Sequence, residues 1–119
     1  MGAGELSIIL AWAGVIVTGW LALLFVLDPV QGMRHTTHRL DQLPRVMADR
    51  YIAMAFLAVG AAWKGDPAVI AWLFAAFAFM GLADAVIYAR AGQPMGRHLA
   101  AGLAAAVVAA IAAWAAAGT

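Results

Sequence analysis

Four apolar stretches, each close to twenty residues long, constrain most strongly what this chain can fold into. An α-helix needs about 20 residues to cross about 30 Å of hydrocarbon. Strands are a poor alternative, because alternation is absent and four isolated strands cannot close a barrel. We therefore predict an all-α membrane protein. The apolar stretches are Leu6–Leu27, Val46–Trp63, Pro67–Ala89 and His98–Ala117, and the helices are expected at about 6–27, 44–64, 67–90 and 95–117.

The composition agrees with a lipid environment. Hydrophobic residues make up 66% of the 119 residues and charged residues 11%, whereas about 25% charged residues is usual in soluble domains. The net charge of +1 and the scattered basic residues argue against a nucleic-acid partner. Cysteine is absent, which excludes disulfides and thiolate chemistry. The first five residues lack the basic start of a signal peptide, so we expect the first stretch to remain as a span.

Turn signals between the stretches predict a single antiparallel four-helix bundle over residues 1–119. In the hairpin Lys64–Pro67, Gly65 suits a left-handed helix end, Asp66 suits an N-cap and Pro67 suits a first helical position. Gly92-Gln93-Pro94 separates the last two helices in the same way. The connection from Asp28 to Leu43 is expected to be the one long loop.

Basic residues near the ends of the spans predict the orientation. One side carries six arginines and the other side carries only Lys64. Basic residues favour cytoplasmic loops. We therefore expect both termini outside, in the inner membrane of a bacterium. The six arginines are Arg34, Arg39, Arg45, Arg50, Arg90 and Arg97.

Asp84 is the residue that most needs a partner. It lies six residues before Arg90, which at 1.5 Å per residue places it about 9 Å inside the interface. A carboxylate at that depth should face the interior of the bundle. Arg50 lies at a matching depth, six residues after Pro44 on a helix of opposite direction. We predict a buried polar cluster near the cytoplasmic side that binds a ligand, formed by Arg50, Asp84 and His98 with Asp49, Tyr51 and Tyr88 beside them.

Arg50 and Asp84 have two open interpretations. They could neutralise each other and set helix register, because breaking a buried pair costs about 3–5 kcal/mol whatever the protein does. They could instead serve a ligand, a proton or a reaction, since ionisable groups inside membranes are commonly functional. Arg50 could also extend alone to the interface.

Two further patterns are weaker. His35 and His38, with Asp41 nearby, could share one helical face, but the flanking arginines and the lack of a third strong ligand argue against a metal site. Gly102, Ala106 and Ala110 form a ridge of small residues suited to close helix packing, within one chain or between two chains. We expect no metal and no cofactor.

Five short motifs together resemble a known family. They are Asp28-Pro29, Asp49-Arg50-Tyr51, Lys64-Gly65-Asp66, Ala83-Asp84-Ala85 and Arg97-His98. They resemble the small bacterial four-helix membrane proteins classed as a domain of unknown function, broadly DoxX-like, over about residues 25–108. In that family an arginine opening the second helix, an aspartate late in the third and a histidine in the fourth look characteristic, which implies roles for Arg50, Asp84 and His98. The family usually has a glycine-rich approach to its arginine, where this chain has Val46-Met47-Ala48-Asp49. The resemblance implies the fold and the cluster but no reaction.

Three functional classes follow from the sequence. The first is a membrane protein that binds a small lipophilic ligand or serves as an accessory subunit, with a protein partner or a second copy as its companion. The second is a small membrane enzyme of isomerase or cyclase type, in which Asp84 is the general acid or base and His98 or Tyr88 the second proton-transfer group. The third is proton-coupled transport, for which four spans are few and the broken helices of transporters are missing. We favour the first class.

Overall fold

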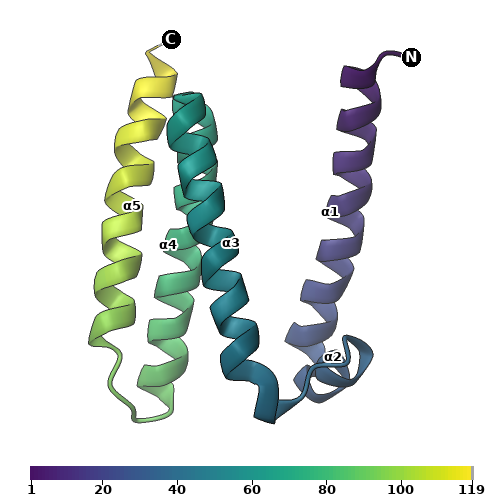
Figure 1. Ribbon diagram of the computed structural model, residues 1–119. Coiled ribbons are helices and arrows are strands. Elements are labelled where there is room, and N and C mark those ends of the chain that lie inside the picture. The colour runs from purple at the N-terminus through teal and green to yellow at the C-terminus, as the bar shows by residue number, and fades with distance from the viewer. Residues whose placement is uncertain (119) are drawn as a thin grey trace. The chain divides into compact units, whose positions relative to one another are not determined.

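The computed structural model describes residues 1–118, which are helical almost throughout and contain no strand (Figure 1). Four segments are long and apolar enough to cross a membrane, by length and composition: Ala3–Leu27, Leu40–Lys64, Pro67–Arg90 and Gly96–Ala117. The predicted all-α class and the four apolar helices are therefore confirmed. The elements are α1 (Ala3–Leu27), α2 (Pro29–His35), the 3-10 helix η1 (Leu40–Gln42), α3 (Leu43–Lys64), α4 (Pro67–Arg90) and α5 (Gly96–Ala117).

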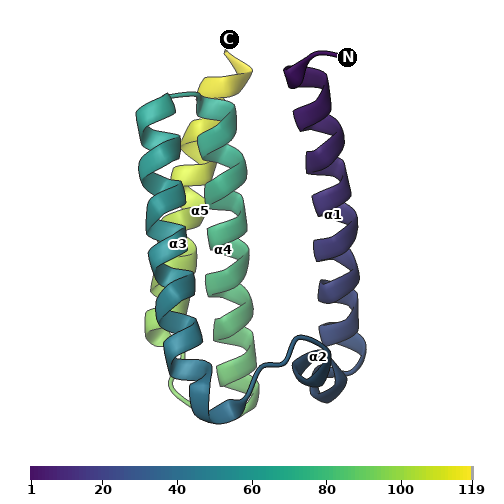
Figure 2. The same cartoon turned by 45° about the vertical axis from the view of Figure 1, so that its right-hand side comes forward.

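The chain divides into two compact units, Met1–Ala48 and Asp49–Thr119. The first contains α1, α2 and η1 with the start of α3. The second contains the rest of α3 with α4 and α5, and these three helices lie side by side in both Figure 1 and Figure 2. The single domain and the four-helix bundle of residues 1–119 stay predictions.

Much of the long loop predicted from Asp28 to Leu43 is helical in the structure, because α2 and η1 lie within it. Asp28 ends α1 as expected, but it also caps α2, because its Oδ1 accepts a hydrogen bond from the backbone N–H of Gln31 at 3.1 Å. Pro29 then occupies the first turn of α2, where a backbone N–H would have no partner within the helix, so the N–H that proline lacks costs no hydrogen bond. The new helix turns back on α1: a Cβ added to Gly32 would lie 2.7 Å from the ring of Phe25. The Asp-Pro pair is thus a helix start as well as a helix end.

The hairpin between α3 and α4 forms as predicted. Gly65 has φ +69°, the left-handed conformation that favours glycine. The side chain of Asp66 accepts a hydrogen bond of 2.9 Å from the backbone N–H of Ala68. Pro67 occupies the first turn of α4. Residues adjacent in the sequence determine this turn.

Small residues bring α4 and α5 together. A Cβ added to Gly81 would lie 2.7 Å from Gly102 Cα, so the two backbones touch. The buried stripe on α5 continues from Gly102 through Ala105 and Ala112. Of the predicted ridge only Gly102 is buried within this chain, whereas Ala106 is half-buried and Ala110 is exposed, so the contact with α4 does not follow the predicted line. Steps of four residues drift around a helix of 3.6 residues per turn, whereas alternating steps of three and four stay on one side.

Large apolar side chains lie mostly on the outside of the described residues. Trp63 and Trp72 are 91% and 82% exposed, whereas the buried hydrophobic residues are all alanines. Water would penalise such a surface, and hydrocarbon would not. Burial therefore follows residue size: small side chains lie in the close contacts between helices, and large ones lie on the outer surface.

Candidate functional site

The turn between α4 and α5 brings the polar residues of the two helices together. Gly92 adopts φ +70°, and the carbonyl of Tyr88 accepts a hydrogen bond of 2.9 Å from the N–H of Gln93. The chain reverses and α5 begins at Gly96. His98, in the first turn of α5, then lies beside the last two turns of α4.

Asp84 and His98 form the polar contact between α4 and α5. His98 Nδ1 lies 3.7 Å from Asp84 Oδ2, which makes an ion pair when the imidazole is protonated. This distance exceeds hydrogen-bond range. Both side chains are partly open, with 42% of Asp84 and 35% of His98 exposed. A third group can therefore reach both the carboxylate and the imidazole.

Tyr88 completes this cluster from one turn further along α4. Its ring stacks on the ring of His98, with centroids 4.7 Å apart and an interplanar angle of 16°. Stacked aromatic pairs of this kind contribute about 0.5–1.5 kcal/mol. The contact holds the imidazole plane in place beside Asp84. We call Asp84, Tyr88 and His98 the α4–α5 cluster.

Arg50 does not join this cluster in the way that the sequence predicted. Its guanidinium pairs with its neighbour Asp49, at 3.4 Å from Nη1 to Oδ1, and both side chains are more than half exposed. Asp84 pairs with His98 instead. Among residues 1–118 the structure has no buried polar or charged side chain, so the predicted buried Arg–Asp–His cluster is absent. Arg50 and Asp84 were predicted to lie at the same depth, but equal depth does not determine the direction in which the Asp84 side chain leaves α4. That direction follows from the packing of Gly81 and Ala85 on the same helix.

The other sequence candidates lie apart from the α4–α5 cluster. Tyr51 follows Arg50 on α3 and is exposed. His35 ends α2, whereas His38 and Asp41 lie before and within η1. Within residues 1–118, no three His, Asp or Glu side chains come together in an arrangement that could hold a metal ion.

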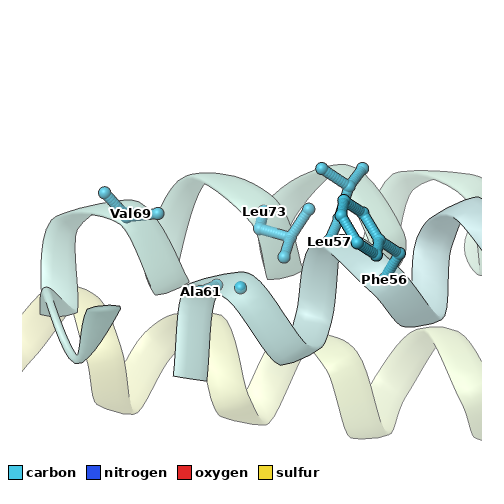
Figure 3. A pocket seen from close by; sticks show the side chains of 6 residues that line it. Phe56, Leu57, Ala61, Val69 and Leu73 are labelled. Atoms are coloured by element: carbon cyan, nitrogen blue, oxygen red, sulfur yellow. The ribbon is translucent and has the colours of Figure 1, made fainter. Parts of the chain in front are cut away.

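A second feature, not predicted from the sequence, is an apolar groove between α3 and α4. It has a volume of about 230 Å³. Figure 3 shows its two walls, one on each helix. Gly60 and Ala61 leave room on α3, and the run of small residues Gly60-Ala61-Ala62 was the available signal. The lining residues are Phe56, Leu57, Gly60, Ala61, Val69 and Leu73.

Comparison of the chain with models of protein families, with curated proteins and with solved structures gave no match. The resemblance to DoxX-like proteins therefore stays a prediction based on its five motifs.

Proposed function

We propose that this protein binds a small lipophilic ligand in the membrane, at the α4–α5 cluster of Asp84, Tyr88 and His98. The observation that supports this most directly is the Asp84–His98 contact at 3.7 Å, partly open to its surroundings and backed by the Tyr88 ring. Polar groups on an apolar helix are costly in hydrocarbon unless they have partners. A lipophile with a polar head group provides such a partner.

The surroundings support a ligand that arrives from the lipid. Four helices are long and apolar enough to cross a membrane, and the residues beside the cluster include the exposed Ile87, about 60° around α4 from Asp84. A polar patch framed by such residues is open to molecules dissolved in the bilayer. Water-soluble substrates would need a path that this apolar surface does not favour.

The proposal includes the topology expected from the sequence. The four spans form one antiparallel bundle in the inner membrane of a bacterium, with both termini outside and the basic loops in the cytoplasm. The distribution of basic residues supports this orientation, with six arginines on one side and Lys64 on the other. The α4–α5 cluster then lies near the cytoplasmic face.

Native mass spectrometry of protein gently extracted from its own membrane tests the proposed binding. The wild type is expected to carry a defined adduct that Asp84→Asn loses, because the amide keeps the shape of the carboxylate but is a weaker hydrogen-bond acceptor and no longer forms an ion pair with His98. Asp41→Asn is the matched control, since Asp41 is an exposed carboxylate in η1. Identical spectra for wild type and Asp84→Asn would refute binding at the cluster, and a co-purifying protein would instead indicate an accessory subunit.

An enzyme is the second candidate, favoured by the side-by-side placement of a carboxylate and an imidazole. Asp84 would act as the general acid or base on a lipophilic substrate, and His98 or Tyr88 would relay the proton. This function requires that the adduct found in the wild type be converted to a product. Conversion that persists in Asp84→Asn would exclude the assignment.

Transport receives less support. Proton-coupled transporters commonly use helices broken near the middle of the membrane, whereas α1, α4 and α5 are each continuous over at least 22 residues.

A further inference from the structure

The apolar groove and the α4–α5 cluster lie along the same side of α4. Leu73 lines the groove, and Asp84 follows it by eleven residues. Eleven residues complete slightly more than three whole turns, so the two side chains leave the helix in nearly the same direction. At 1.5 Å per residue, they are about 16 Å apart along the axis.

The surface between these two positions is apolar and accessible. Phe77 and Met80 occupy the intervening turns, and neither is buried. Phe77 also contacts Phe74 edge-to-face, with ring centroids 5.3 Å apart. A flexible chain can therefore follow α4 from Asp84 to the groove without crossing a polar group.

The size of the groove favours a chain over a ring system. Pockets that enclose drug-sized molecules have volumes of about 300–1,000 Å³, whereas this groove has about 230 Å³. Gly60 opens one wall, since a Cβ added there would meet no atom within 4 Å. The groove thus holds part of an elongated molecule.

The cluster selects the head group. Asp84 supplies carboxylate acceptors, the imidazole and the Tyr88 hydroxyl can donate or accept, and the ion-pair partner of Asp84 is His98 and not an arginine. A carboxylate or phosphate head would meet the negative charge of Asp84. A hydroxyl group can donate to Asp84 and accept from its neighbours.

We propose that the ligand is an elongated, single-chain lipophile with an uncharged hydroxyl head group, bound with its head at Asp84, Tyr88 and His98 and its chain along α4 into the groove. This inference rests on the proposed function. It adds the ligand class and a second region of binding, in which Leu57 and Val69 contact the far end of the chain.

Straight-chain fatty alcohols of increasing length are the probes, and their binding is measured by titration in native mass spectrometry. Gly60→Leu places a side chain in the groove, where the added Cβ meets open space. It is expected to weaken binding of the longest alcohols about tenfold, equivalent to about 1.4 kcal/mol, and to leave the shortest unchanged. Ala62→Leu is the matched control, because Ala62 is exposed and lies about 200° around α3 from Gly60. Val69→Phe fills the groove from α4 and serves if Gly60→Leu fails to fold.

The outcomes separate this inference from the function on which it rests. Binding that depends on Asp84 but is insensitive to chain length and to both groove variants would overturn the inference and leave the proposed function standing. Equal binding of the alcohols by the wild type and by Asp84→Asn would refute both. Fatty acids of the same chain length test the head group: tighter binding of the acid than of the alcohol would overturn the hydroxyl assignment.

Discussion

Gly81 and Gly102 meet backbone to backbone: a Cβ on Gly81 would lie 2.7 Å from both the Cα and the N of Gly102. This contact sets the distance between α4 and α5. Asp84 follows Gly81 by one turn on α4, and His98 precedes Gly102 by one turn on α5. The separation of the polar side chains therefore depends on two residues that have no side chain.

Gly81→Ala is expected to destabilise the protein by up to about 2 kcal/mol, because a methyl group added to a packed interface usually costs about 1–3 kcal/mol and helix propensity offsets about 1 kcal/mol of this. The clashing atoms belong to the backbone of Gly102, so α4 and α5 must separate. Thermal unfolding in detergent, followed by circular dichroism, measures the change.

Gly60→Ala is the matched control for this prediction. Its added Cβ meets open space, so the substitution should raise stability by up to about 1 kcal/mol through helix propensity alone. A loss of stability in Gly81→Ala and a gain in Gly60→Ala would show that contact between helices determines the effect of the added methyl group. Equal shifts in the same direction would contradict the close approach of Gly81 and Gly102.

Asp66→Ala is expected to cost about 0.5–2 kcal/mol by removing the cap of α4. The lost interaction is the 2.9 Å hydrogen bond from the N–H of Ala68 to Asp66 Oδ1. Asp66→Ser should recover most of the loss, since serine also caps helix N-termini. Chemical denaturation of the three proteins measures the differences, and equal stability of the alanine and serine variants would argue against capping.

The fold could be predicted from the sequence where neighbouring residues determine it. Helix length followed from apolar stretches near the span length, and the α3–α4 turn followed from Gly65, Asp66 and Pro67. The same local rules do not predict α2, because they place Asp28 at the start of a loop and not at the N-cap of a further helix. A single aspartate can cap the helix that follows it as well as end the one before.

The site was harder to predict because it depends on the rotation of each helix. Rise per residue predicts depth, and on depth alone Arg50 was an acceptable partner for Asp84. Rotation is set by which small residues pack, and helices that are apolar all round carry little pattern to reveal it. The packing of Gly81 against Gly102 turns Asp84 toward His98, whereas Arg50 pairs with Asp49 on its own helix.

Tyr88→Phe and Tyr88→Leu separate the two roles of the tyrosine. The ring stacks on His98, so Tyr88→Leu should lower stability by about 0.5–1.5 kcal/mol, whereas Tyr88→Phe keeps the stack and the stability. Both variants lack the hydroxyl and should weaken alcohol binding. Thermal unfolding and native mass spectrometry are measured on the same samples. Full binding by Tyr88→Phe would exclude the hydroxyl as a contact of the head group.

The proposed orientation can be tested with single cysteines, because the natural chain has none. Gly4→Cys and Lys64→Cys should react on intact cells with a membrane-impermeant maleimide, since both positions are expected outside. Gln93→Cys, in the α4–α5 turn between Arg90 and Arg97, should react only after permeabilisation. The physical reason is the preference of arginine-rich loops for the cytoplasm. Labelling of Gln93→Cys on intact cells, with protection of Lys64→Cys, would reverse the orientation and move the α4–α5 cluster to the outer face.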